Sequence, residues 1–373
     1  MSVVDYSAGG SIGILPVIWR LKGRSVLDAV VHPSRVLVLA ALIPAAVVLS
    51  ACVGGADRHS SQSDPGGGFD ILRRADPCGF VSPDTFSGIA VDVPGTARPE
   101  VDIEPDDFLS CKVVVDLPGD SRFVKLYIHI EAKGRDKDPP TMPTRTVTHD
   151  GDISIARSPR TAGSDYSTRV RANDAYSVQV WSSPHTSAAD SADIDRAGER
   201  TVAAVVAQLR SGSLPALEFP PDSVGAMDLC SALTAPEVEA VSGDSGITTA
   251  QQPHSCVWQS RPSGRRAGDD VTLEARLDTE GLDRLPAETI AGRITHTYPN
   301  DNDGFPWCRL TTTIKVWSPW PGHRSSLPYV SEPGPLYENV TLTAQVEHGG
   351  PDRACHIARE LATRAWPHLP SAH

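Results

Sequence analysis

Hydrophobic and polar residues alternate in four stretches of this chain. One face of each stretch is formed by Val124, Leu126, Ile128 and Ile130; by Val271, Leu273, Ala275 and Leu277; by Leu310, Thr312, Ile314 and Val316; and by Val340, Leu342, Ala344 and Val346. A period of two residues is that of β-strands, in which successive side chains point to opposite faces. The alternation with polar residues predicts antiparallel sheets with one buried face.

Two other stretches have the period of an α-helix, and each ends near a Leu-Pro pair. Their apolar faces consist of Val202, Val205, Val206 and Leu209 in the first, and of Cys355, Ala358, Leu361, Ala362 and Ala365 in the second. Such a stripe is typical of a helix that packs on a core. Strands followed by a closing helix predict an α+β arrangement, with each helix laid on a sheet.

An internal repeat divides the chain into two halves. Each half contains the same short pattern, which begins with a cysteine, Cys78 or Cys230. Apolar residues follow, and then a helix-start signal in which Ser82 or Thr234 can cap the helix. Glu237 also fits a capping box with Thr234. The prediction is therefore a fold of two tandem α+β modules, each a mainly antiparallel sheet with packed helices, joined by a proline-rich linker. The three segments are 71–213, 214–225 and 226–373.

The N-terminal region has the order of an export signal. Four basic residues between positions 20 and 35 precede an uncharged run, Val36–Leu49, which has the length of a signal-peptide apolar region. The run ends in Leu49-Ser50-Ala51-Cys52, which resembles the lipobox of bacterial lipoproteins. That resemblance implies a signal peptide over 1–51, a lipid on Cys52, and attachment to the outer face of the cell membrane. The alternatives are an uncleaved membrane anchor and a buried core helix.

Two further predictions concern the ends of this region. Residues 1–19 lie upstream of the basic residues and are not needed for export, which fits a start codon placed too far upstream. Residues 52–70 are polar and glycine-rich, and we expect a flexible tether there.

The charge of the chain argues against one class of partner. Net charge is −12 at pH 7. Without residues 1–51, 30 basic and 44 acidic residues remain. A chain this acidic, with no basic stripe, is a poor candidate for binding nucleic acid.

The cysteines predict a disulfide framework. With Cys52 assigned to lipid, an even number remains, as expected of disulfides in an exported chain. Spacing alone does not choose among the pairings, but the repeat makes two of them equivalent and leaves a third. Glu199 stands where the last cysteine of the second half does, so the first half lacks the third bridge. The expected pairs are Cys78–Cys111, Cys230–Cys256 and Cys308–Cys355.

A zinc site is the competing interpretation of the cysteines. The Cys-x-x-Cys spacing of structural zinc sites is absent from the sequence. We therefore expect neither a metal nor a cofactor.

The cysteine pattern also carries a family resemblance. The lipobox, Asp76-Pro77-Cys78 before a short helix, a strand-opening cysteine and a late cysteine in a closing helix are similar to an uncharacterised family of actinobacterial cell-envelope lipoproteins. The pattern also resembles the disulfide-bonded extracytoplasmic sensor domain of some mycobacterial serine/threonine kinases. It extends over about 76–210 and again over 227–370. Two departures are the missing late pair in the first half and Met227-Asp228-Leu229 in place of Asp-Pro. The resemblance implies a location in the cell envelope and a fold, but it does not indicate any activity.

Three short motifs could carry chemistry. Gly243-Asp244-Ser245-Gly246 looks like the nucleophile segment of trypsin-like proteases, but no matching histidine segment precedes it, which favours a turn. Asp301-Asn302-Asp303-Gly304 resembles part of a calcium loop, but a full loop needs an oxygen ligand at the position of Pro299 and a carboxylate at that of Leu310, and both positions fail, which favours a hairpin. Trp317 and Trp320, stiffened by prolines, form a candidate binding surface for sugar or peptide; the alternative is that they pack on the core.

No catalytic constellation emerges from these motifs. The leading hypothesis is a non-catalytic envelope lipoprotein that binds a protein, glycan or lipid partner. An envelope enzyme acting on cell-wall material is the alternative from another class, and a pocket with convergent His, Asp or Glu side chains of shifted pKa would favour it. A structural spacer is the third hypothesis.

Overall fold

The computed structural model describes residues 67–89, 99–118, 122–132, 146–158, 166–172, 175–182, 189–260, 269–282, 284–301, 305–318, 320, 324–325 and 334–371. All of them belong to one compact unit, Ser60–His373. The predicted signal peptide, Cys52 with its predicted lipid, and most of the predicted tether lie outside the described residues. Among those described, no helix has the length and apolar character needed to cross a membrane.

The first half of the chain forms one sheet, with helices before and after its strands. In chain order they are α1 (Gly67–Arg73), the 3-10 helices η1 (Pro77–Phe80) and η2 (Pro83–Phe86), β1 (Glu100–Asp107), β2 (Ser110–Leu117), β3 (Arg122–Ala132), β4 (Thr146–Asp150), β5 (Ile153–Arg157), β6 (Tyr166–Arg171), β7 (Tyr176–Ser182) and α2 (Ser191–Arg210). We call this part the first module.

The second half repeats the same kind of succession, and we call it the second module. Its elements are η3 (Leu229–Ser231), α3 (Ala235–Ser242), β8 (Thr248–Gln252), β9 (Ser255–Gln259), β10 (Asp270–Asp278), β11 (Ala287–Ile290), β12 (Arg293–Asn300), β13 (Trp307–Trp317), β14 (Arg324–Ser325), β15 (Leu336–Gln345), α4 (Gly350–Ala365) and η5 (Trp366–His368).

The two sheets have the same strand order. The first runs β1-β2-β3-β7-β6-β5-β4 and the second β8-β9-β10-β15-β13-β12-β11, and the paired strands within each are antiparallel. Counting along the chain, and leaving out the short β14, each strand of one sheet occupies the position of its counterpart in the other. β14 belongs to the second half in sequence but pairs with the edge strand β1 of the first sheet. The predicted repeat thus corresponds to two sheets of equal topology.

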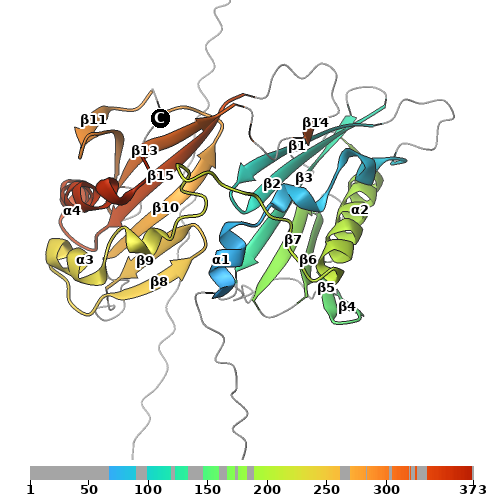
Figure 1. The fold of residues 1–373 in the computed structure, drawn as a ribbon, viewed down its shortest axis with the longest axis horizontal. Coiled ribbons are helices and arrows are strands. Elements are labelled where there is room, and N and C mark those ends of the chain that lie inside the picture. Colours follow the sequence, from blue (N-terminus) through green and yellow to red (C-terminus); the bar gives the residue numbers. More distant parts are fainter. Residues whose placement is uncertain are drawn as a thin grey trace, which may run out of the picture. The chain divides into compact units, whose positions relative to one another are not determined.

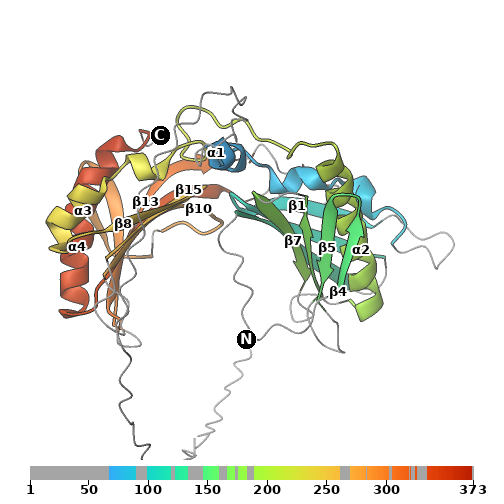
Figure 2. The same cartoon turned by 90° about the horizontal axis from the view of Figure 1, so that it is seen from below.

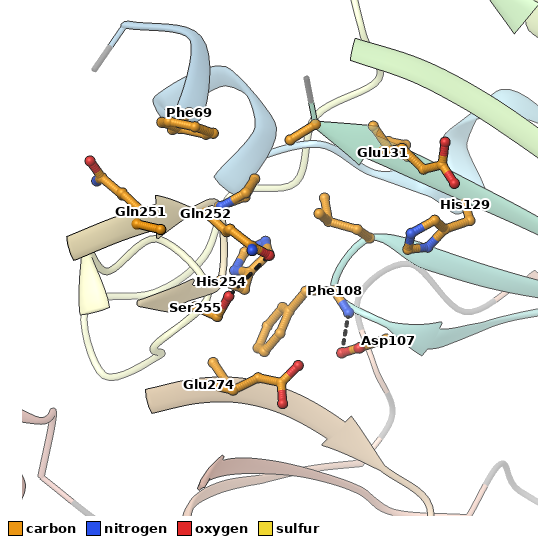
Figure 3. A pocket seen from close by; sticks show the side chains of 16 residues that line it. Phe69, Asp107, Phe108, His129, Glu131, Gln251, Gln252, His254, Ser255 and Glu274 are labelled. Carbon is orange, nitrogen blue, oxygen red and sulfur yellow. Dashed lines mark hydrogen bonds between the residues drawn. The ribbon is translucent and has the colours of Figure 1, made fainter. Parts of the chain in front are cut away.

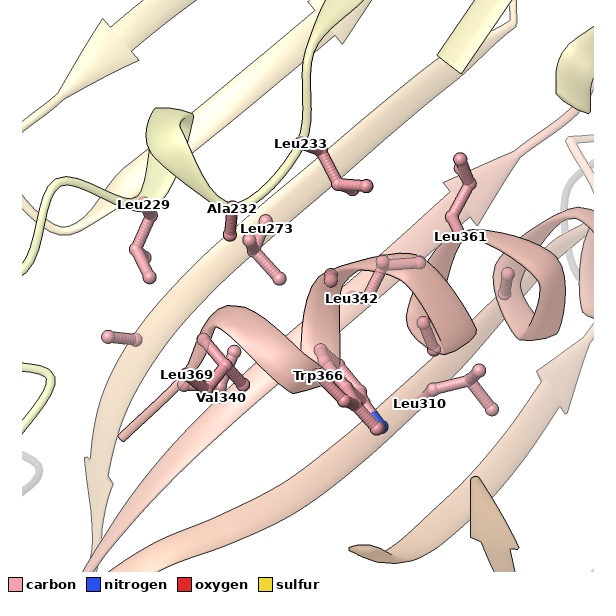
Figure 4. Packing of buried hydrophobic residues seen from close by; sticks show 14 of the residues in the cluster. Leu229, Ala232, Leu233, Leu273, Leu310, Val340, Leu342, Leu361, Trp366 and Leu369 are labelled. Carbon is pink, nitrogen blue, oxygen red and sulfur yellow. The ribbon is translucent and has the colours of Figure 1, made fainter. Parts of the chain in front are cut away.

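Helices cover one face of each sheet (Figures 1 and 2). α2 packs on β6 and β7, and α4 packs on β13 and β15. All of the apolar positions predicted for the two closing helices are buried in the cores. In the second module Trp366 is fully buried beside Leu310 and Leu342, under the last turns of the helical segment (Figure 4).

The disulfides are the three pairs that the repeat predicts, Cys78–Cys111, Cys230–Cys256 and Cys308–Cys355. The first two have the same surroundings. The Asp76 side chain accepts a hydrogen bond from the Cys78 amide at 3.0 Å, and the Asp228 side chain accepts one from the Cys230 amide at 3.0 Å. A capping box follows in both modules, at Ser82 in one and at Thr234 in the other, and it starts η2 and α3.

The register shows what the first module has in place of the third disulfide. Cys308 pairs with Ala344. Following the paired residues from strand to strand across the sheet, this row of neighbours reaches Trp258 of β9, which lies two residues after Cys256. The corresponding row of the first sheet starts two residues after Cys111 and ends at Tyr166 of β6. Tyr166 therefore occupies the place of Cys308, and Glu199 of α2 occupies that of Cys355.

Two sequence predictions need correction. The helix α1 begins at Gly67, so the predicted tether over 52–70 ends earlier than expected. The register of β13 shifts between Thr313 and Lys315, and this bulge turns Val316 to the exposed side, where it is 47% exposed. An extra residue in a strand reverses the faces beyond it, which the alternating pattern does not reveal.

The linker between the two halves packs against both modules. The Pro215 carbonyl accepts from the Asp76 amide at 2.8 Å, and the Leu217 amide donates to the Arg74 carbonyl at 2.8 Å. Further along, the Ser223 hydroxyl donates to Glu338 of β15 at 2.8 Å. Because Glu338 is fully buried, these contacts hold the linker to the second sheet.

Candidate functional site

Trp317 and Trp320 do not form the open platform that was considered for them. Their exposed fractions are 8% and 5%, and both belong to the core of the second module. The two rings meet edge to face with centroids 5.0 Å apart, and the indole nitrogen of Trp317 donates to Glu338 at 2.9 Å. The bulge in β13 turns Trp317 inward, so the packing alternative is the one that the structure favours.

Two equivalent hairpin turns meet elsewhere in the molecule. The β1–β2 turn of the first module and the β8–β9 turn of the second each present a carbonyl to the strand β3 or β10. Leu109 accepts from the Ile130 amide at 2.9 Å, and His254 accepts from the Ala275 amide at 2.9 Å. The Phe108 ring stacks on the His254 imidazole with centroids 4.6 Å apart and an interplanar angle of 19°. The first module thereby inserts a side chain into the core of the second.

A pocket of about 340 Å³ lies where these turns meet. Figure 3 shows how side chains from α1, β3, the two turns and β10 surround it. The lining contains both apolar groups and several titratable ones. It consists of Phe69, Asp107, Phe108, Leu109, His129, Ile130, Glu131, Ala132, Ala250, Gln251, Gln252, Pro253, His254, Ser255, Glu274 and Ala275.

Asp107 is held by backbone donors. Its Oδ1 accepts from the Phe108 amide at 2.8 Å and from the Leu277 amide at 3.2 Å. The second bond joins the two modules. Burial raises the pKa of Asp107 to about 6, an effect that these hydrogen bonds oppose and that the nearby Glu274 carboxylate adds to. At neutral pH the group is therefore mostly ionised, but close to its protonation range.

His254 is buried without hydrogen-bond partners for its ring. Both ring nitrogens are shielded from water, and neither has a partner among the described residues. Burial, together with the smaller effect of the Arg73 guanidinium, lowers the pKa of His254 to about 3. The imidazole is therefore neutral at physiological pH. A buried polar group without partners costs on the order of 1–3 kcal/mol, which marks the turn as a place where packing alone does not explain the residue.

The other carboxylates of the pocket are paired. Glu131 contacts Arg169 at 2.9 Å and accepts from the Ser177 hydroxyl at 3.2 Å. Glu274 contacts Arg276 at 2.8 Å. Within the part of the chain that the structure describes, no group of three or more His, Cys, Asp or Glu side chains is arranged to hold a metal ion. The pocket thus combines the neutral imidazole of His254, an apolar wall, and one carboxylate, that of Asp107, without an ion-pair partner among the described residues; His129, Gln251, Gln252 and Ser255 are its other polar members.

A second cavity of about 680 Å³ lies beside the end of α4. The Arg293 guanidinium at its edge donates to the carbonyls of Trp366 at 3.1 Å, Leu369 at 2.9 Å and Pro370 at 2.5 Å. These are the carbonyl groups left over where a helical segment ends. Arg293 is therefore engaged in capping the segment, and this cavity offers fewer groups to a ligand.

The remaining sequence motifs contribute no site. Gly243 ends α3 in the left-handed conformation, with φ of 81°, and Gly246 has φ of 71°, so Gly243–Gly246 is a turn. Residues 302–304 of the calcium-like motif lie outside the described residues.

Sequence reasoning missed the pocket residues. Asp107 and His254 both sit in hairpin turns, where polar residues are ordinary. Aligning the repeat strand by strand would have placed the two turns at equivalent positions, but no signal in the chain says that the turns contact each other.

Comparisons with known proteins give no further guide. No protein-family model matches the chain, and neither a curated protein nor a solved structure matches it.

Proposed function

We propose that this chain is a lipid-anchored protein of the cell envelope that binds a small ligand in the pocket between its two hairpin turns. The observation that carries the binding function is the pair Asp107 and His254. They come from different modules and line one pocket, and each has polar atoms without partners among the described residues. A ligand seated between the turns could reach groups of both modules at once.

The address is supported by the chain's N-terminal region and by its cysteines. The basic region, the uncharged run and the lipobox-like Leu49–Cys52 favour export and lipidation of Cys52. Three disulfides fit an oxidising compartment. The acidic charge argues against nucleic acid as the partner.

Native mass spectrometry tests the binding function. The full-length chain is purified from the envelope of an actinobacterial host, and its mass under native conditions is compared with its mass after denaturation. We expect an excess mass that denaturation releases. Ala250 is exposed and lines the pocket, so Ala250→Trp should fill the pocket from its rim and abolish the excess. Thr249→Trp, the exposed neighbour on the same edge strand, is the matched control and should retain it.

Equal masses before and after denaturation would count against the proposal. So would an excess that both variants retain, because the ligand would then lie elsewhere.

One observation favours the enzyme alternative. Asp107, whose pKa is raised to about 6, and Glu274 line the same pocket, as an acid and a second carboxylate do in many glycoside hydrolases. Against it, Glu274 is held by Arg276, and Asp107 makes no hydrogen bond to His254 in the described structure. Hydrolysis of chromogenic glycosides, lost in Asp107→Asn but not in Asp106→Asn, would establish catalysis. No turnover above a buffer control would leave binding as the function.

A further inference from the structure

One of the carboxylates that line the pocket has no positively charged partner among the described residues. Three carboxylates line it, and two of them have a guanidinium partner: Glu131 contacts Arg169 at 2.9 Å, and Glu274 contacts Arg276 at 2.8 Å. Asp107 forms no ion pair with any described residue. Among the carboxylates that line the pocket, the one without a counter-charge among the described residues therefore belongs to Asp107, whose hydrogen bond from the Leu277 amide joins the two modules.

The geometry of Asp107 leaves one oxygen open. Both of its hydrogen bonds, from the Phe108 and Leu277 amides, go to Oδ1. Oδ2 has no partner among the described residues, and it is not one of the buried atoms that lack a partner. Figure 3 shows the Asp107 carboxylate at the lower side of the pocket, with Phe108 and Glu274 nearby. An approaching donor could therefore reach Oδ2 without displacing the backbone bonds.

Neither His254 nor Arg276 supplies the missing positive charge, and His129, the other imidazole of the lining, is not among the groups that act on Asp107. His254 is buried and neutral. Arg276 acts on Asp107 across a distance, but Glu274 acts in the opposite sense and has the larger effect. The rest of the wall is largely apolar, with Phe69, Leu109 and Ile130 among its members.

We propose that the ligand of this pocket is a small organic cation, an amine with an apolar body, whose ammonium group pairs with Asp107. This inference rests on the proposed binding function and names the class of its ligand. A half-buried carboxylate that already accepts two hydrogen bonds forms a strong charge-assisted bond with an ammonium donor. The apolar wall then covers the body of the ligand, and Phe69 offers it an aromatic surface.

Three isosteric probes separate charge from shape. Benzylammonium, benzyl alcohol and benzoate are titrated into the full-length chain at pH 7.5 and followed by calorimetry. We expect benzylammonium to bind at least about tenfold more tightly than either of the others, since one charge-assisted bond contributes on the order of 1.5–3 kcal/mol. Raising the salt concentration should weaken benzylammonium binding and leave benzyl alcohol unaffected.

Two variants locate the charge. Asp107→Asn keeps an oxygen that can accept both backbone amides, so the turn should remain folded, and its affinity for benzylammonium should fall about tenfold. Asp106→Asn removes a charge from the exposed neighbour and should change the affinity by less than twofold. The salt series on the unaltered chain needs no variant and provides the second measurement.

The outcomes distinguish the two proposals. Binding of benzyl alcohol or benzoate as tight as that of benzylammonium, or an unchanged affinity in Asp107→Asn, overturns the cation and leaves a binding pocket. Binding of none of the three probes also overturns the cation. The binding function itself fails separately, when the native mass shows no excess that Ala250→Trp removes.

Discussion

The Tyr166 hydroxyl donates to Glu199 Oε1 at 3.1 Å, and this hydrogen bond occupies the place that the Cys308–Cys355 disulfide has in the second module. Arg157 completes the contact, with Nε and Nη2 at 3.1 and 2.8 Å from the two oxygens of Glu199. Both devices tie the closing helix to the sheet at the same position. They differ in kind, because one is covalent and the other is a polar contact at a half-exposed site.

Removing the two devices should therefore have unequal effects. Replacing Cys308 and Cys355 by alanine opens a loop with a sequence separation of 47 residues and should cost about 4 kcal/mol in the free energy of unfolding in the chain-entropy model. Tyr166→Phe loses one hydrogen bond and should cost about 1 kcal/mol. Urea unfolding measures both. Equal losses in the free energy of unfolding would contradict this difference between the disulfide and the hydrogen bond.

Gly198 should not tolerate a side chain. A Cβ added there would lie 2.5 Å from the Tyr166 ring. Gly198→Ala should therefore destabilise the first module by about 1–3 kcal/mol, as overpacking does. In a background with Tyr166→Leu the same substitution should cost much less. Unfolding of the four chains gives the coupling, and a cost that does not depend on residue 166 would contradict the close packing.

Glu338 should be required for the linker to dock. Its carboxylate is fully buried and accepts from the Ser223 hydroxyl, the Val224 amide and the Trp317 indole. Glu338→Gln would direct an amide N–H at one of these donors, so it should cost about 2–3 kcal/mol. Proteolysis within the linker should also become faster. A variant as stable as the parent, with an unchanged cleavage rate, would contradict the network.

The same carboxylate gives a pH effect with a definite sign. Burial raises the pKa of Glu338, and its hydrogen bonds oppose the rise. The stability that Glu338 contributes is thus fully present below the pKa that it has in the unfolded chain, and it is lost as pH rises through its pKa in the folded protein.

Asp107 should favour the folded state at acid pH. Its pKa rises from 3.8 to about 6 on folding. Its stabilising contribution is therefore complete below pH 3.8 and is lost as pH rises through about 6, with a magnitude of at most about 3 kcal/mol. The difference in unfolding free energy between the parent and Asp107→Asn should change with pH in this window. A difference that is flat from pH 4 to 7.5, to within about 0.5 kcal/mol, would contradict the assignment.

His254 should act in the opposite direction. Its pKa falls from 6.5 to about 3 on folding, so the stability it contributes is present above pH 6.5 and is lost as pH falls through about 3. The loss should reach roughly 3–5 kcal/mol across that window. His254→Phe keeps a ring against Phe108 and removes the titration, so acid unfolding should move to lower pH. Unchanged acid unfolding in this variant would show that the imidazole is not held neutral.

Much of the framework could be predicted from the sequence because it depends on local chemistry. Cys78 and Cys230 each follow an aspartate that caps them, and the equal spacing to Ser82 and Thr234 identifies the repeat and with it the disulfides. The closing helices were visible because their apolar stripes have a helical period. These signals lie within a few residues of one another along the chain.

The features that the sequence did not reveal depend on contacts between distant segments. The bulge near Ile314 reverses Val316 and Trp317 without altering the composition of the strand. The linker residue Ser223 is polar, and only the buried Glu338 of β15 makes it part of the core. The pocket follows the same rule, since Phe108 contacts His254 at a sequence separation of 146 residues, and neither residue type is unusual in its own turn.

The most direct test of the account is the intact mass of the full chain extracted from the membrane of an actinobacterial host, measured before and after reduction. We expect a mass that begins at Cys52 and carries a diacylglyceryl group, and that rises by about 6 Da on reduction, about 2 Da for each of the disulfides. A chain that keeps residues 1–51 without lipid, or that contains free thiols at Cys78, Cys230 or Cys308, would contradict the export, the anchor and the disulfide framework together.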